Sequence, residues 1–207
     1  MHDLLLHQLS IKGFAKVDVL CESLQAERAA VDALVERLLA TGVVEETRMG
    51  LRLTEQGKAD VATQLQGALD AARGSAALEA FYVAFDPLNK HYKAAVADWQ
   101  MREGPDGEPV INDHSDADYD AQVTRRMFEN HALLLEQLSK LEAEWRLLAH
   151  YGKRLTAALA RVEGGEQRYV AAPLIDSYHT VWFEFHEALI RFSGRNRADE
   201  AAAGHAV

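Results

Sequence analysis

The sequence predicts a mainly α-helical protein that carries one short β-hairpin near its N-terminus. Apolar residues recur at helical spacing over 31–39, and Gly42 is expected to end that helix. Two short strands follow at 43–46 and 51–53, joined by a tight turn. Beyond this hairpin the pattern is almost purely helical, so helices are expected to supply most of the fold.

Residues 1–65 are expected to fold as a winged helix-turn-helix domain. Helix, strand, turn, strand and helix follow one another here in the order that is typical of that fold. The turn of the helix-turn-helix is placed at Ser23-Leu24-Gln25 and the turn of the short wing at Met49-Gly50. The predicted helices of this domain are 2–10, 17–24, 26–41 and one that opens at Thr54-Glu55.

Residues 66–197 are expected to form an all-α effector or dimerisation domain, followed by a disordered tail at 198–207. Asp86 is expected to cap a helix with Pro87 in its first turn, and the Pro/Gly-rich segment 103–109 is expected to be a loop. The predicted helices are 76–85, 87–99, a long one that ends near 148, 153–162 and 173–193, with breaks at Gly74-Ser75, Tyr151-Gly152 and Gly164-Gly165.

The chain is acidic, with 22 Lys and Arg against 32 Asp and Glu and a net charge of −10. Residues 1–65 contain seven basic and ten acidic residues, so the predicted winged helix is itself acidic. DNA binding usually needs a basic face, because phosphate neutralisation supplies most of the non-specific affinity. Binding to double-stranded DNA would therefore depend on a local basic patch, and a winged helix that contacts protein is the alternative.

The candidate DNA contacts lie at the start of the third helix and around the wing. Arg28 is the only typical guanine or phosphate donor at that helix start, whereas Glu27 and Asp32 would repel phosphates. The expected DNA-binding residues are Lys12, Lys16, Gln25, Arg28, Arg48 and Arg52.

Nothing in the sequence predicts membrane contact or a cofactor. No apolar run approaches the roughly 18 residues that cross a bilayer, and no secretory signal is apparent. The single cysteine, Cys21, cannot form an intramolecular disulfide, which fits a cytoplasmic location. Its apolar surroundings predict a buried thiol.

The last predicted helix carries polar residues among aromatic ones. Asp176, His179 and His186 are placed on one face, where they could bind a metal or act in acid–base catalysis. The chain has no Gly-x-Ser-x-Gly or His-Glu-x-x-His motif. A polar pocket or a core network is therefore the favoured interpretation, and neither a metal site nor an enzyme activity is expected.

A second group of candidate ligand contacts lies just before the Pro/Gly-rich loop. Trp99, Gln100 and Arg102 supply an aromatic ring and a bidentate donor, although an interhelical salt bridge is the alternative role for Arg102. With the last helix they predict a pocket for a small polar or anionic ligand. The expected ligand-binding residues are Trp99, Gln100, Arg102, His114, Tyr178, His179, Trp182 and His186.

Residues 112–120 form a polar cluster with four Asp, one Asn and one His. Oxygen-rich segments of this kind can bind Ca²⁺ or Mg²⁺, but the mid-loop glycine and the terminal glutamate of an EF-hand are missing. The favoured interpretation is a helix start, with Ser115 or Asp116 as the N-cap.

Two N-terminal strings, Leu-Ser-Ile-Lys-Gly-Phe-Ala (9–15) and Leu-Arg-Leu-Thr-Glu-Gln-Gly (51–57), resemble the MarR-like winged-helix regulators of bacteria. Strings at 98–102, 112–116 and 173–184 resemble a helical domain of actinobacterial proteins of this size. Similar modules accompany phosphoenolpyruvate-utilising enzymes. In MarR-like proteins long dimerisation helices flank the winged helix on both sides, whereas few residues precede Ile11 here.

This resemblance implies a DNA-binding transcriptional regulator. Its helical domain is expected to sense a small-molecule effector, to form a homodimer through the C-terminal helices, or to do both. The first alternative is an interaction module of a phosphoenolpyruvate-utilising enzyme system. The second alternative is a metal-dependent hydrolase built on Asp176, His179 and His186.

Overall fold

The computed structural model describes residues 1–72, 74–104, 106–141 and 145–195. These residues are mainly helical, which confirms the predicted fold class at that level. Within these ranges no helix is both long and apolar enough to span a membrane. The N-terminal elements are α1 (His2–Lys12), α2 (Val17–Leu24), α3 (Arg28–Ala40), β1 (Val44–Thr47), β2 (Gly50–Leu53) and α4 (Glu55–Ala72).

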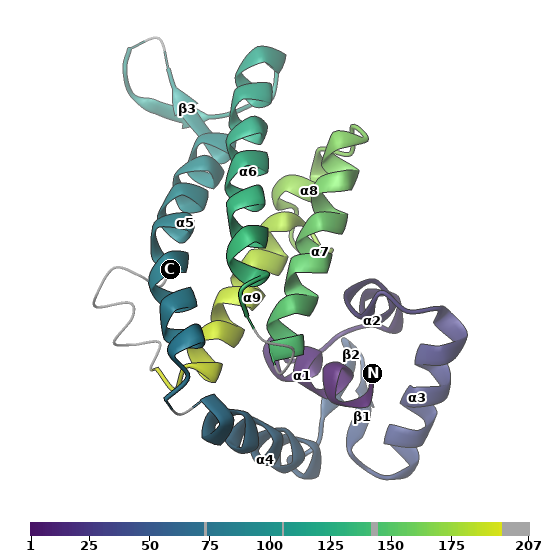
Figure 1. The fold of residues 1–207 in the computed structure, drawn as a ribbon. Helices are drawn as coiled ribbons and strands as arrows, with labels where there is room; N and C mark the ends of the chain where they lie inside the picture. The colour runs from purple at the N-terminus through teal and green to yellow at the C-terminus, as the bar shows by residue number, and fades with distance from the viewer. Residues whose placement is uncertain (73, 105, 142–144, 196–207) are drawn as a thin grey trace.

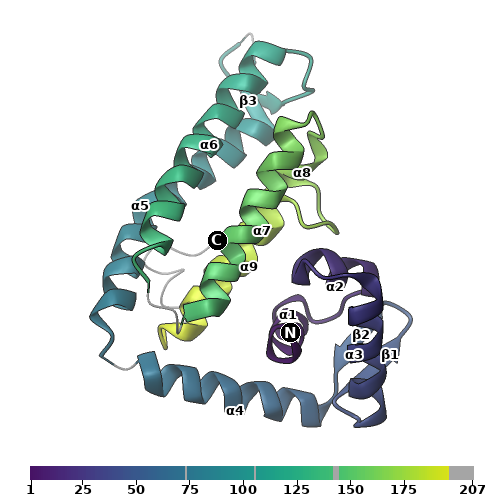
Figure 2. The same cartoon turned by 45° about the vertical axis from the view of Figure 1, so that its right-hand side comes forward.

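The C-terminal elements build a bundle in which four long helices, α5, α6, α7 and α9, stand together (Figure 1). α4 runs across one end of this bundle and joins it to α1, α2, α3 and the first hairpin (Figure 2). The elements are α5 (Ala76–Gln100), β3 (Met101–Glu103), β4 (Pro109–Ile111), α6 (Ala117–Leu138), α7 (Arg146–Glu163), α8 (Arg168–Ala171) and α9 (Tyr178–Phe192).

The N-terminal elements enclose a hydrophobic cluster of their own. Leu5 and Leu9 of α1 are buried there with Val31 and Leu38 of α3. Cys21, which was expected to be buried, is half-buried against this cluster. A separate and larger cluster fills the bundle, so the two parts of the chain have distinct cores.

Strand β2 is paired on both sides. It forms an antiparallel hairpin with β1, and Leu51 also forms a bridge with Ala15, just before α2. Leu51 and Leu53 are buried while Arg52 is exposed, which is the alternation that the sequence predicts for this strand. Gly50 is required at the turn, because a Cβ there would lie 2.5 Å from the Ala15 carbonyl oxygen and φ is 129°.

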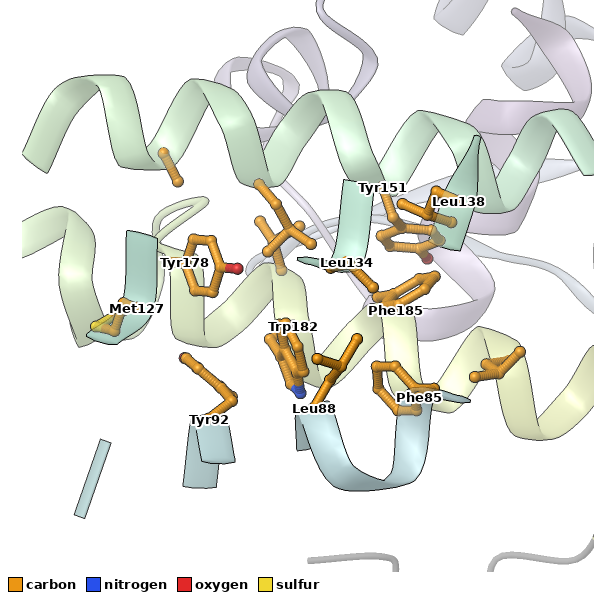
Figure 3. Packing of buried hydrophobic residues seen from close by; sticks show 14 of the residues in the cluster. Phe85, Leu88, Tyr92, Met127, Leu134, Leu138, Tyr151, Tyr178, Trp182 and Phe185 are labelled. Atoms are coloured by element: carbon orange, nitrogen blue, oxygen red, sulfur yellow. The ribbon is translucent and has the colours of Figure 1, made fainter. Parts of the chain in front are cut away.

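An aromatic seam holds α5 against α9 (Figure 3). The Trp182 ring of α9 lies 4.3 Å from the Tyr92 ring and 5.4 Å from the Phe85 ring, between centroids. The indole N–H of Trp182 donates to Asn89 Oδ1 at 2.9 Å, so its polar atom is satisfied inside the core. Phe185 extends the seam by an edge contact with Phe85 at 5.3 Å.

Helix α5 runs through Pro87 without a break, so the predicted division at Asp86 is wrong. Proline deprives only one carbonyl, that of Val83, of its helical donor, and Val83 is exposed to water. Phe81, Phe85 and the residues at helical spacing after them stay buried in the bundle core on both sides of the proline. Core packing thus outweighs the local cost of Pro87.

Helix α7 likewise contains Tyr151-Gly152, where a break was predicted. Gly152 allows close packing of α7 on α6, because a Cβ would lie 2.9 Å from Leu138 Cδ1. The long helix expected to reach 148 instead ends at Leu138, and α7 begins at Arg146. The glycine therefore marks a helix contact and not a helix end.

β3 pairs with β4 in a second hairpin, so Glu103 and Pro109, the ends of the segment that was predicted to be a loop, lie in paired strands. Every residue of β4 is exposed, so the strand lacks the alternation that reveals strands in a sequence. The last helix starts at Tyr178 and not at Pro173, because Ser177 Oγ accepts a hydrogen bond from the Thr180 N–H at 3.2 Å.

The predicted domain boundary between residues 65 and 66 falls inside α4, which continues from Glu55 to Ala72. A single helix therefore connects the two hydrophobic cores. The predicted tail, 198–207, lies outside the described residues.

Candidate functional site

The turn between α2 and α3 places two of the predicted DNA contacts, Gln25 and Arg28, at the surface. Gln25 has a left-handed backbone with φ 51° and ends α2. Arg28 is held by two carboxylates, with its Nη1 2.5 Å from Asp18 and its Nε 2.8 Å from Asp32. Both pairs lie at the surface and are weak, so a DNA phosphate can replace them.

The first hairpin and the segment before α2 carry three more predicted DNA contacts. Arg52 Nε lies 2.7 Å from Glu45 across the hairpin. Arg48 at the hairpin turn and Lys16 before α2 are exposed and have no ion-pair partner among the described residues. Arg48 and Lys16 are therefore the cations most readily available to a partner on this side of the molecule.

Lys12, the sixth predicted DNA contact, points into the interior. Its Nζ lies 2.6 Å from Glu184 Oε1 and 3.1 Å from Asp176 Oδ1. Only 10% of the Lys12 side chain is exposed. In this arrangement Lys12 does not join Lys16 and Arg48 at the surface.

Lys12 belongs to a group that we call the buried charge cluster, made of Lys12, Arg154, Asp176 and Glu184. Arg154 Nε donates to Asp176 Oδ2 at 2.8 Å, and its Nη2 lies 2.9 Å from Glu184 Oε2. Arg154 Nη1 donates to Gln8 Oε1 at 3.0 Å. Two cations balance two carboxylates, as burial of charge requires. Lys12 and Gln8 come from α1, Arg154 from α7 and Glu184 from α9, so the cluster joins the N-terminal part to the bundle.

Hydrogen bonds from α2 extend this junction. Ser23 Oγ lies 3.3 Å from Asp176 Oδ1, and the Ser23 carbonyl accepts from His150 Nε2 at 2.7 Å. The Tyr169 hydroxyl donates to Glu22 Oε1 at 3.0 Å. Helix α2 is therefore attached to α7, α8 and the segment before α9.

His7 of α1 lies beside the buried charge cluster as a neutral imidazole. Burial, followed by the positive charges of Arg191 and Arg154, lowers the pKa of His7 to about 3. His7 Nε2 is hydrogen-bonded to the Tyr151 hydroxyl at 2.9 Å, and its ring stacks on Phe192. A neutral His7 leaves the charge balance of the cluster unchanged.

Sequence reasoning did not identify Arg154 and Glu184, although the pattern contains a signal for each. Arg154 follows Tyr151 by three residues and precedes Ala158 by four, and both of these are core positions of α7. Glu184 directly precedes the buried Phe185. Spacing alone can show that a charged residue occupies a core position of an amphipathic helix. Such a residue needs an opposite charge beside it.

The eight predicted ligand-binding residues do not form one pocket. Four of them line a groove of about 360 Å³ between α5 and α9, which we call the α5–α9 groove. Buried rings of Tyr92 and Trp182 line it together with the partly exposed Phe183, and Lys93 is its only lining Lys or Arg among the described residues. The four predicted residues are Gln100, His179, Trp182 and His186.

A second concavity, which we call the α8 cleft, has a volume of about 540 Å³. It lies between the end of α5, residues 111–114 and the start of α8. Gln167, Arg168 and two alanines form its α8 side. Three predicted residues line it, Trp99, Gln100 and His114, so Gln100 is shared by both concavities.

His114 and Asp120 form a hydrogen-bonded pair in the α8 cleft. His114 Nδ1 lies 3.0 Å from Asp120 Oδ2, and only 4% of the Asp120 side chain is exposed. Asn112 Nδ2 donates to Asp120 Oδ1 at 2.9 Å and to the Trp99 carbonyl at 3.1 Å. The His114 and Trp99 rings lie 4.3 Å apart between centroids. These contacts fix both the position and the plane of the imidazole.

The polar cluster 112–120 is a helix start, in agreement with the favoured interpretation. Asp116 Oδ1 accepts from the Tyr119 N–H at 3.0 Å and caps α6. Across the described ranges, no group of three or more His, Cys, Asp or Glu side chains is placed to hold a metal ion. The buried role of Asp120 was not predicted; its spacing of three from the core residue Val123 was the available clue.

The remaining predicted ligand contacts lie elsewhere. Tyr178 is fully buried, with its hydroxyl 3.3 Å from His131 Nδ1. Arg102 Nη2 lies 3.1 Å from Asp113 Oδ1 beside the second hairpin. Arg102 thus forms a salt bridge, as in its alternative role, but the bridge does not join two helices. Neither residue lines the groove or the cleft.

Asp176, His179 and His186 do not share one face, contrary to the prediction. Asp176 precedes the first residue of α9, and its carboxylate faces Lys12 and Arg154 in the buried charge cluster. His179 and His186 line the α5–α9 groove instead. The late start of α9 removes the helical spacing on which the prediction depended.

Comparison of the chain with family models, curated proteins and solved structures finds no match. The MarR-like resemblance of segments 9–15 and 51–57 therefore stays an expectation from the sequence. Three features of the described residues carry the functional argument: the surface around α3, the buried charge cluster and the two concavities.

Proposed function

We propose that the chain is a DNA-binding transcriptional regulator whose residues 1–65 form a winged helix-turn-helix. One observation carries this proposal: α2, a left-handed turn at Gln25 and α3 are followed at once by a hairpin that also bridges to Ala15. A helix-turn-helix presents the start of its second helix to the major groove, and the hairpin then flanks that helix as a wing.

The DNA-binding surface in this proposal consists of the start of α3 and the turn of the first hairpin. Gln25 and Arg28 would reach base edges or phosphates, and Arg48, Arg52 and Lys16 would hold the phosphate backbone. The acidic composition of residues 1–65 does not exclude DNA binding, because the ion pairs of Arg28 and Arg52 are exposed and weak. Binding is expected to be strongly salt-dependent.

The buried charge cluster supports a regulatory role for the bundle. It connects α1, and through Ser23 also α2, to α7 and α9. A small molecule that binds the bundle more tightly in one arrangement of this junction would shift the population of DNA-competent molecules. We propose that regulation follows this route, and that the C-terminal helices provide homodimerisation.

Fluorescence anisotropy with labelled DNA from upstream of the protein's own gene tests the proposal at two salt concentrations. Micromolar protein should bind at the lower concentration and release at the higher one. The double variant Lys16→Ala/Arg48→Ala should bind more weakly and lower the slope of log K against log salt by about 0.9 per lost phosphate contact. Lys140→Ala is the matched control, because Lys140 lies just after α6 and pairs with Glu136 at the surface. Absence of salt-sensitive binding in the wild type refutes the proposal.

A protein partner in place of DNA is the second candidate, as in an interaction module of a phosphoenolpyruvate-utilising enzyme system. The observation that favours it is the exposed side of α3, which presents the methyl groups of Ala29, Ala30 and Ala33 where a DNA reader carries polar side chains. Ala33→Asp should abolish capture of such a partner. Binding of the DNA described above by the wild type would instead favour the first candidate.

A further inference from the structure

The α8 cleft contains a histidine whose position and orientation are fixed by its surroundings. His114 has φ 58°, a left-handed conformation that is uncommon for residues other than glycine. Asn112 holds it there, because its Oδ1 accepts from the His114 N–H at 3.2 Å. Backbone conformations of this kind concentrate at functional sites, which directs attention to what the His114 ring presents.

His114 lines the α8 cleft, and its two ring nitrogens differ in their partners. Its Nδ1 is engaged by the buried Asp120 carboxylate, and Nε2 has no partner among the described residues. The Asp120 carboxylate accepts from Nδ1–H. An oxyanion beside Nε2 would stabilise a proton on that nitrogen as well, and Nε2–H would then be a charge-assisted donor to it.

The α8 side of the cleft supplies a cation. Arg168, at the first turn of α8, lines the cleft with a side chain that is 62% exposed, and it pairs with Glu166 at 3.1 Å. Among the described residues no carboxylate lines the cleft. Trp99 and Ile111 add apolar surface to the same cleft. The cleft therefore combines an imidazole and a guanidinium with an aromatic and aliphatic wall.

We propose that the α8 cleft binds the oxyanion group of a small molecule, a phosphate or a carboxylate, between His114 Nε2 and the Arg168 guanidinium. Asp120 is a positioning residue that orients the ring through its bond to Nδ1. The apolar part of the molecule packs on Trp99 and Ile111. This site is distinct from the α5–α9 groove, which shares only Gln100 with it.

The cleft also lies on the chain segment that leads to the buried charge cluster. Ala172 lines the cleft, and Asp176 follows four residues later with both carboxylate oxygens in the cluster. Leu174 between them has φ 68° and is 85% exposed. An anion that draws Arg168 toward His114 would shift this segment and, through Asp176, affect the buried charge cluster. Only this regulatory consequence rests on the proposed function.

Histidine side-chain ¹H–¹⁵N spectra of the full chain, recorded without DNA, test the site directly. Inorganic phosphate and sodium acetate are titrated separately at constant ionic strength and pH, with chloride as the reference anion. One of the two should move the His114 resonances saturably at millimolar concentration, and the one that does identifies the source of the oxyanion. Equal, non-saturating effects of phosphate, acetate and chloride overturn the proposal.

The variants are chosen so that a structural effect is recognisable. Arg168→Gln should weaken anion binding, followed by the His114 resonances, by about tenfold or more, equivalent to about 1.4 kcal/mol. His114→Gln should weaken it as much when binding is followed by isothermal titration calorimetry. Arg161→Gln is the matched control, because Arg161 also pairs with Glu166 and lies over the Tyr169 ring but does not line the cleft. Unchanged affinity in Arg168→Gln, or equal loss in Arg161→Gln, refutes the assignment whether or not the protein binds DNA.

Discussion

Arg154 contacts both carboxylates of the buried charge cluster and also α1. Its guanidinium contacts Asp176, Glu184 and Gln8, and only 1% of its side chain is exposed. The planar guanidinium group makes these contacts at the same time, which the single ammonium group of a lysine cannot do.

Replacement of Arg154 by methionine should lower the free energy of unfolding by about 3–5 kcal/mol, because it leaves two buried carboxylates with Lys12 alone. Arg154→Lys keeps the charge and should lose less. Urea denaturation at neutral pH measures both. Arg126→Met is the control, since Arg126 pairs with Asp98 at the surface and should cost at most about 1 kcal/mol. A loss for Arg154→Met as small as this control would contradict the role assigned to the cluster.

His131 makes stability dependent on pH. Burial lowers its pKa to about 4, from the ordinary histidine value of 6.5. Because the folded state binds this proton more weakly than the unfolded state, the stabilisation is fully present above pH 6.5 and is lost as pH falls toward 4. His7, with its pKa lowered to about 3, acts in the same direction.

His131→Gln should therefore reduce the slope of the free energy of unfolding against pH in the acid range by up to about 1.4 kcal/mol per pH unit. The measurement is the free energy of unfolding at a series of pH values from neutral into the acid range. The slope is the readout, since loss of the bonds to Thr156 and Tyr178 also lowers stability at every pH. His91→Gln, at an exposed position of α5, should leave the slope as it is; an unchanged slope in His131→Gln would contradict the assignment.

At the scale of single elements, Gly50 fixes the first hairpin against α2. Its positive φ excludes a side chain, and so does the Ala15 carbonyl oxygen, which would lie only 2.5 Å from a Cβ at this position. Gly50→Ala should cost more than about 1 kcal/mol, by the combined effect of strain and a lost strand bridge. Gly67→Ala is the control, because Gly67 lies in α4 with open space at its Cβ and should gain up to about 1 kcal/mol.

Thermal unfolding measures both glycine variants, and amide exchange of Leu51 reports the bridge to Ala15. Equal stability of Gly50→Ala and the wild type would show that the hairpin does not need the close approach. The same result would weaken the wing in the proposed function, since its position beside α2 depends on this contact.

The sequence predicted elements well where one local signal dominates. The apolar spacing of α3, the Leu51 and Leu53 alternation and the N-cap at Asp116 all reappear in the structure. Prediction failed where a contact with residues distant in the sequence decides whether a helix continues. Pro87 and Gly152 look like breaks locally, yet the bundle core and the close packing of Leu138 keep both helices intact.

The candidate sites follow the same division. The sequence assigned Trp99, Gln100 and His114 to one pocket with His179 and His186, whereas the structure divides these residues between the α8 cleft and the α5–α9 groove. It could not reveal that Lys12 meets Glu184, because the two residues are far apart in sequence and no local pattern records such a pair. Long-range ion pairs depend on how two cores are joined, which one helix pattern cannot specify.

At the scale of the whole molecule, two hydrophobic cores are joined by α4 and by the buried charge cluster. Lys12 is the one cation that α1 contributes to this cluster. Its removal should therefore loosen the N-terminal part while the bundle keeps its own core. Separate cores allow such local opening without global unfolding.

Lys12→Met should raise hydrogen exchange in α2 and α3 relative to α5 and α6, because the N-terminal part then opens more often than the bundle. Hydrogen exchange followed by mass spectrometry measures the difference. Lys58→Met is the matched control, since Lys58 pairs with Glu55 at the surface of α4 and should leave the exchange pattern as in the wild type. A uniform rise across all helices in Lys12→Met would contradict this prediction. It would mean that the two cores unfold as one cooperative unit and that the N-terminal part does not open by itself.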